Sequence, residues 1–133
     1  MFAGHFGIGL GLKRWAPAVS LGTLFLAAQW VDLLWPTLLL LDLEHVRIAP
    51  GATELTPLDF YDYPLTHSMV GAVIWAFGFA LLYGLLSRSK APAVICAVAV
   101  FSHWALDFLV HRPDLLLVPG GDLKVGLGGW NSL

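Results

Sequence analysis

Two histidines and an aspartate occupy one face of an otherwise apolar stretch in the C-terminal third of this chain. His103, Asp107 and His111 follow one another at intervals of four residues, so on an α-helix they form one stripe. An imidazole and a carboxylate one turn apart can hold a metal ion between them. His111 and Arg112 precede Pro113 and are also typical of a helix end, where basic residues and a proline stop are common. His103 and Asp107 lie at least one turn deeper, where charged groups must pair, bind an ion or line a wet cavity.

The composition is that of an integral membrane protein. Of the 133 residues, 58% are apolar and only 12% are charged, whereas about 25% of the residues of a typical soluble domain are charged. The six tryptophans are typical of proteins whose rings lie at the bilayer interface. A net charge of −2 offers no basic surface for nucleic acid. We therefore predict one all-α domain over residues 1–133, a helical bundle in the lipid bilayer, with small-residue faces around Gly71 and Gly78 that permit oligomers.

Three apolar runs are each long enough to cross a bilayer, which takes about 20 residues. The predicted elements are a short helix and three long spans, over residues 2–12, 17–41, 65–86 and 91–110. Pro36 is expected to kink the first span. Thr66 is expected to cap the second span at its N-terminus.

The segments between the spans predict the orientation of the chain. Four of the seven lysines and arginines lie in two short turns without acids, at 13–14 and 88–90. The positive-inside rule places both turns in the cytoplasm, so we predict a multi-pass protein of a bacterial cytoplasmic (inner) membrane. The polar loop 42–64 then faces outward and is expected to form a lid of turns or a short helix. In the tail, 111–133, we expect residues 127–133 to open a partial helix, as in a truncated or minimal form.

This topology brings five potential metal ligands to one depth, in the outer half of the membrane. They come from four separate segments and comprise His5, Asp32, His67, His103 and Asp107. The first of them reaches this layer if helix 2–12 folds back along the first span to about residues 25–29. Taken singly, each has an ordinary explanation, such as a packed histidine, an acid paired with Gln29 or an imidazole that extends to the interface. Together they predict an intramembrane polar site.

The ligand types favour a divalent metal, zinc first, with manganese or iron as alternatives, because calcium would need more oxygen ligands. A hydrolytic zinc site keeps an open position for water and lowers the pKa of that water towards neutrality. Asp32, His103 and Asp107 are therefore candidate catalytic residues for hydrolysis of an ester or phosphoester, with a lipid or lipid-linked substrate natural at this depth. The candidates for substrate or supporting contacts are Gln29, Ser68, His111 and Arg112, the last as a phosphate clamp or simply as a helix-end arginine.

The motifs resemble those of the membrane-bound metal-dependent hydrolases of bacteria. In that family an early histidine and an aspartate in the first span precede a Thr-His-Ser run and a Ser-His-x-x-x-Asp run. Here these motifs are His5, Asp32, residues 66–68 and residues 102–107. The family is similar to the helical fold of zinc-dependent phospholipase C, and the resemblance implies zinc ligands at His67, His103 and Asp107, with His5 and Asp32 beside them. Many relatives carry Asp-x-Asp-His after the first span, where this chain has Asp-Leu-Glu-His at 42–45.

Two other classes of function remain open from the sequence. The same polar residues could form an ion or proton relay between the helices of a permease subunit. Alternatively, they could form a buried hydrogen-bond cluster in a non-catalytic structural subunit. Three long spans are few for a transporter, which favours the hydrolase.

Overall fold

The computed structural model describes residues 2–54 and 56–129. Its helices are α1 (Phe2–Leu12), α2 (Leu21–Ala28), α3 (Trp30–Leu40), α4 (Pro64–His67), α5 (Met69–Ser87) and α6 (Lys90–Val110). Its strands form two antiparallel pairs, β1 (His45–Ile48) with β2 (Leu58–Asp62) and β3 (Leu115–Leu116) with β4 (Lys124–Val125). The chain is thus mostly helical, but the prediction of an all-α fold is wrong, because loop 42–64 and the tail each contain a β-hairpin.

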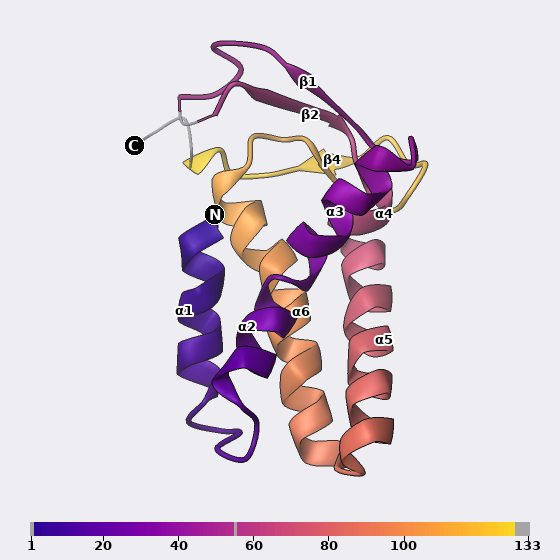
Figure 1. Ribbon diagram of the computed structural model, residues 1–133. Helices are drawn as coiled ribbons and strands as arrows, with labels where there is room; N and C mark the ends of the chain where they lie inside the picture. Colours follow the sequence, from indigo (N-terminus) through magenta and orange to yellow (C-terminus); the bar gives the residue numbers. More distant parts are fainter. Residues whose placement is uncertain (1, 55, 130–133) are drawn as a thin grey trace.

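The helices stand side by side with both hairpins at one end (Figure 1). The turns that follow α1 and α5, which carry the basic residues at 13–14 and 88–90, lie at the opposite end. Small buried side chains, among them Ala27, Ala76 and Ala99, fill the interior of the bundle and let the helices approach closely. Gly9 lets α1 approach α2 closely, because a Cβ at that position would lie 2.8 Å from the ring of Phe25.

Two helices, α5 and α6, are long and apolar enough to cross a membrane. The pair α2 and α3 passes the same test only as a bent unit, so a third span depends on that pair. Large apolar side chains such as Phe77, Leu85 and Ile74 are exposed on α5, as expected for a surface that lipid covers. The predicted helix 2–12 and the last predicted span agree closely with α1 and α6.

The first predicted span is broken at Gln29, between α2 and α3, with a bend of 50°. Pro36, where we expected the kink, lies inside α3. The last carbonyls of a helix have no partner within it, so the break leaves the carbonyl of Ala28 free to accept a hydrogen bond from another element. His103 on α6 uses it: its Nδ1 lies 2.9 Å from that oxygen.

The second predicted span also starts differently from the prediction. Thr66 lies within the short helix α4 rather than at the cap of the span. Ser68 caps α5 instead, with its Oγ accepting the N–H of Gly71 at 3.0 Å. This arrangement leaves the side chain of Thr66 available for the site described below.

The two hairpins fold over the ends of α5 and α6. Opposite charges face each other across β1 and β2, with Arg47 opposite Asp59 and His45 opposite Asp62, a pairing that stabilises two-stranded ribbons. In the tail, the N–H of Leu127 donates to the carbonyl of Phe108 at 2.8 Å. The partial helix predicted over 127–133 is not seen at 127–128, and residues 130–133 lie outside the described part of the chain.

Candidate metal centre

Five side chains predicted as metal ligands meet inside the helical bundle. They come from α1, α3, α4 and α6 and comprise His5, Asp32, His67, His103 and Asp107. The imidazoles and Asp107 are buried, whereas the side chain of Asp32 is 28% exposed. Two overlapping sets of three are close enough to hold an ion, one containing His5, His103 and Asp107 and the other Asp32, His67 and His103. We call these five residues the buried cluster.

Four nitrogen–oxygen separations in the buried cluster resemble those between the ligands of a tetrahedral ion. His103 Nε2 lies 3.3 Å from Asp32 Oδ1 and 3.2 Å from Asp107 Oδ2. His67 Nε2 lies 3.6 Å and 3.8 Å from the same two oxygens. Zinc ligands about 2.0–2.1 Å from the ion stand about 3.3–3.4 Å apart in a tetrahedron. Four edges of this arrangement are therefore close to what a single zinc ion requires.

The orientation of His103 leaves a lone pair facing two acids. A carbonyl oxygen can only accept, so Nδ1 carries the proton that it donates to Ala28. In the neutral ring Nε2 then has a lone pair and no proton. Nε2 makes no hydrogen bond with the described residues, although Asp32 and Asp107 lie within 3.3 Å of it. A lone pair facing anionic oxygens is repulsive, so the geometry requires a cation between them, either a proton or a metal ion.

His67 is oriented in the same way by a second acid that lies behind it. The hydroxyl of Thr66 donates to Glu44 Oε2 at 2.7 Å, and its N–H donates to Oε1 at 2.7 Å. Because the hydroxyl proton is used, Thr66 Oγ1 accepts from His67 Nδ1, 2.7 Å away. Nε2 of His67 is then left with a lone pair directed at the two aspartates. A carboxylate that fixes the tautomer of a ligating histidine is a common support of metal sites.

His5 stacks on His103 and lies close to Oδ1 of Asp107. The two rings are stacked, with centroids 3.8 Å apart and planes within 8°. His5 Nε2 lies 3.4 Å from Asp107 Oδ1, the oxygen that is not turned to His103. His5 therefore either binds a second ion or holds Asp107 in place, and the number of ions bound per chain separates these roles.

A layer of aromatic side chains covers the buried cluster on the hairpin side. Tyr63 and Trp35 contact the ring of His67, with centroids 5.0 Å and 6.5 Å away. Phe60 on β2 contacts both of these aromatic residues. These rings pack around the buried imidazole of His67, and their low local dielectric strengthens the electrostatic interactions of the cluster.

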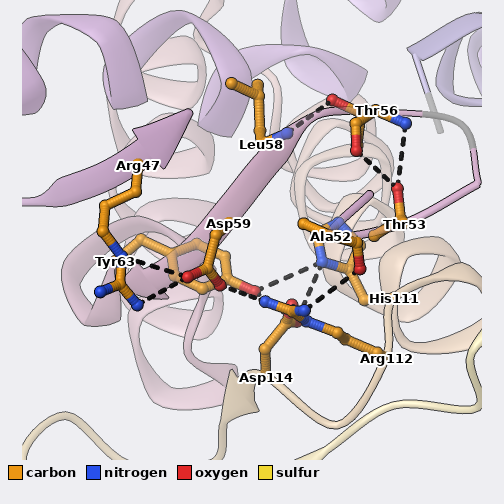
Figure 2. Close-up of polar contacts among 10 residues, drawn as sticks. All are labelled: Arg47, Ala52, Thr53, Thr56, Leu58, Asp59, Tyr63, His111, Arg112 and Asp114. Carbon is orange, nitrogen blue, oxygen red and sulfur yellow. Dashed lines mark hydrogen bonds and ion pairs between the residues drawn. The ribbon is translucent and has the colours of Figure 1, made fainter. Parts of the chain in front are cut away.

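Beyond the aromatic layer lies a second polar group, drawn in Figure 2. We call it the outer network, and its members are Arg47, Asp59, Tyr63, His111, Arg112 and Asp114. Asp59 pairs with Arg47 at 2.7 Å and with Arg112. Arg112 also donates to Asp114 at 3.2 Å and to the carbonyl of Ala52 at 3.2 Å. The network thereby joins the β1–β2 hairpin to the end of α6.

Two shifted pKa values show how firmly the outer network is paired. The hydrogen bond from Arg47 holds the pKa of Asp59 below its usual range, although burial opposes this effect. Burial raises the pKa of Tyr63, so its phenol keeps its proton and donates to Asp114 at 2.7 Å. His111 Nδ1 lies 3.1 Å from the same carboxylate.

The remaining predicted residues have separate positions. Gln29 is buried at the break between α2 and α3, and Ser68 caps α5. His111 and Arg112 belong to the outer network rather than to the buried cluster. Their contacts with a substrate stay predictions.

Sequence reasoning missed Glu44, which looked like a solvated acid at the end of a span. It is 1% exposed and supports His67 through Thr66. The signal that pointed to it was the Asp-x-Asp-His run of the resembling family, in which Glu44 stands at the second acidic position.

Comparisons with known proteins leave the site to be interpreted from its own geometry. No protein-family model matches the chain, and no curated protein or solved structure matches it. The resemblance to the membrane-bound metal-dependent hydrolases therefore depends on the sequence motifs alone.

Proposed function

We propose that this chain is a membrane-embedded, metal-dependent hydrolase of an ester or phosphoester. A divalent ion, zinc first and manganese or iron as alternatives, would be held by His67, His103, Asp32 and Asp107. One observation carries the proposal. Two imidazole nitrogens with lone pairs and two carboxylate oxygens point into one space, at separations of 3.2 to 3.8 Å.

The hydrogen bonds behind the cluster support a metal ion as its occupant. The hydrogen bonds behind His67 and His103 direct neutral nitrogens inward, as metal binding requires. When bound, a zinc ion lowers the pKa of a coordinated water to about 7 and so supplies a nucleophile at neutral pH.

The exposed member of the cluster marks the side from which a substrate would arrive. Asp32 is 28% exposed, whereas the other four side chains are at most 7% exposed. We infer that Asp32, with His103 and Asp107, contacts the reacting group. Because the basic turns lie at the opposite end of the bundle, the positive-inside rule favours a cluster near the outer leaflet of a bacterial cytoplasmic membrane.

The proposal is tested with two chromogenic probes, p-nitrophenyl butyrate and bis(p-nitrophenyl) phosphate, on protein purified in detergent. We expect hydrolysis of at least one probe, loss of that hydrolysis on chelation and its return with added zinc. His103→Ala should be inactive. His45→Ala is the control, because it removes an imidazole whose acidic partners are Asp42 and Asp62 of the same loop, and it should leave hydrolysis intact.

Two outcomes would contradict the hydrolase. Hydrolysis that resists chelation would exclude a metal-dependent reaction. Ion flux in proteoliposomes that survives chelation but fails in Asp107→Asn would instead support the permease alternative.

A further inference from the structure

A groove of about 220 Å³ lies beside the exposed member of the buried cluster. It runs between α1 and the bent pair α2 and α3. Its lining residues are Phe6, Phe25, Leu26, Gln29, Asp32 and Leu33. Four of these are apolar, and the two polar ones are Asp32 of the cluster and the neighbouring Gln29. The groove is therefore mostly apolar and borders the candidate metal centre at Asp32.

The bend at Gln29 explains why the groove and the cluster meet. Phe25 precedes the break and Leu33 follows it, so the groove spans both helices of the pair. Phe6 closes the other wall from α1, with its ring edge-on to Phe25 at 5.1 Å between centroids. Asp32, in the first turn of α3, is shared by the groove and the ligand set.

The surroundings of the groove identify the chemistry of its occupant. Leu26 and Leu33 at its rim are 43% and 54% exposed, and they belong to the bent pair that passes the membrane-spanning test. A rim of this kind faces lipid tails rather than water. Small-molecule pockets measure about 300–1,000 Å³, so this smaller channel suits a segment of one hydrocarbon chain rather than a whole lipid.

We propose that this groove binds the acyl chain of a bilayer lipid and presents the ester or phosphoester at its head to Asp32. The substrate then enters sideways from the membrane and not through the aromatic layer under the hairpin. This inference rests on the proposed hydrolase and specifies its substrate class. A second apolar groove, lined by Val73, Ala76, Phe77, Ala97, Val98 and Phe101 between α5 and α6, touches no cluster residue and serves as the comparison.

The test uses photolabelling, which reports binding without any reaction at the metal. The full chain is reconstituted in phosphatidylethanolamine and phosphatidylglycerol vesicles that contain a trace of phosphatidylethanolamine with a diazirine on its acyl chain. After illumination, labelled positions are mapped by mass spectrometry. Leu26→Trp fills the groove, and Val98→Trp fills the comparison groove at a similarly exposed position.

We expect labelling of Phe6 and Phe25 to exceed labelling of the comparison groove. Leu26→Trp should reduce labelling at these two phenylalanines about tenfold, the change that about 1.4 kcal/mol of lost binding free energy produces. Val98→Trp should leave it unchanged. Equal labelling of the two grooves, or labelling that persists in Leu26→Trp, would overturn the acyl-chain site.

Failure of the groove and failure of the hydrolase give different results. If the soluble nitrophenyl probes are hydrolysed but the groove is not labelled, lateral entry is wrong and the hydrolase stands. If the groove is labelled in wild type and in His103→Ala but neither protein hydrolyses a probe, presentation to a hydrolytic centre is wrong.

Discussion

The buried cluster and the outer network lie on either side of one aromatic layer, and both combine histidines with aspartates. In the outer network each aspartate has an arginine partner: Asp59 pairs with Arg47 and Arg112, and Asp114 pairs with Arg112. In the buried cluster, Asp32 and Asp107 lie beside the ring nitrogens of histidines. The outer network is thus built from arginine–carboxylate pairs, whereas the buried cluster combines imidazoles with carboxylates, the ligand types of a zinc site.

The supporting hydrogen bonds sharpen this difference. Behind the buried cluster, the carbonyl of Ala28 and the Glu44–Thr66 pair both turn imidazole nitrogens inward. In the outer network, the hydroxyl of Tyr63 donates a hydrogen bond to Asp114, which also pairs with Arg112. The burial of a histidine near an aspartate therefore does not by itself indicate a metal site. The proton on the far nitrogen decides whether the near one can bind a metal.

The largest expected difference comes from the two buried aspartates near the end of α6. Asp107→Asn removes a proposed ligand, and we expect hydrolysis of the chromogenic probes to fall by at least about 100-fold, more than loss of a supporting group would cause. Asp114→Asn breaks a contact of the outer network and should leave turnover per folded molecule unchanged. Initial rates normalised to folded protein measure both. An equal loss of hydrolysis in the two variants would contradict the proposal that only the buried cluster takes part in the reaction.

A smaller effect is expected behind the cluster, at Glu44. In Glu44→Gln the amide can donate to Thr66 Oγ1, which turns the threonine proton towards His67 and reverses the tautomer. We expect metal affinity to fall about 10- to 100-fold, measured by competition with a chromogenic chelator. Asp62→Asn, an acid on β2 of the same outer loop, should not change this affinity. An unaltered affinity in Glu44→Gln would remove His67 from the ligand set.

In the outer network, replacement of Arg112 should affect stability and not metal binding. Arg112→Met leaves Asp59 with only Arg47 and weakens the junction between the hairpin and α6. We expect a loss of about 1 kcal/mol, the upper range for a partly exposed ion pair, measured by thermal unfolding in detergent. A selective rise in KM for the phosphodiester probe, with no change for the carboxyl ester, would instead show that Arg112 clamps a phosphate.

The smallest expected effect is the pH dependence of the pair between His45 and Asp62. The hydrogen bond to Asp62, 2.7 Å long, raises the pKa of His45. Because the folded pKa lies above the unfolded value of about 6.5, the stabilisation is full below that value. It is lost as pH rises through the folded pKa. Thermal unfolding of wild type and His45→Gln should therefore converge as pH rises, and a gap that widens with pH would contradict this sign.

Much of the buried cluster could be predicted from local spacing and alternating helix direction. His103 and Asp107 are one turn apart on a long apolar helix. Their side chains therefore share one face of the helix, whatever the helix packs against. His5 and His67 reached the same layer because short turns force neighbouring helices to run in opposite directions. These predictions needed only helix geometry and the position of the turns.

The features that sequence reasoning missed depend on contacts between distant residues. The first predicted span breaks at Gln29 and not at Pro36. The residue types at these two positions do not predict where the break lies. Loop 42–64 forms a hairpin in which Arg47 pairs with Asp59 across the strands, and Arg112, just after α6, pairs with the same acid. Glu44 is buried only because Thr66 supplies both donors. No local pattern encodes any of these partners.

The most direct test of the metal centre is elemental analysis of the full chain, purified without added metal, beside His103→Ala and His111→Ala. The account predicts at least one equivalent of a transition metal per chain in wild type and in His111→Ala, and its loss from His103→Ala. A second equivalent that is lost in His5→Ala would assign His5 to an ion of its own. Wild-type protein without stoichiometric metal, even after incubation with zinc, would contradict the account.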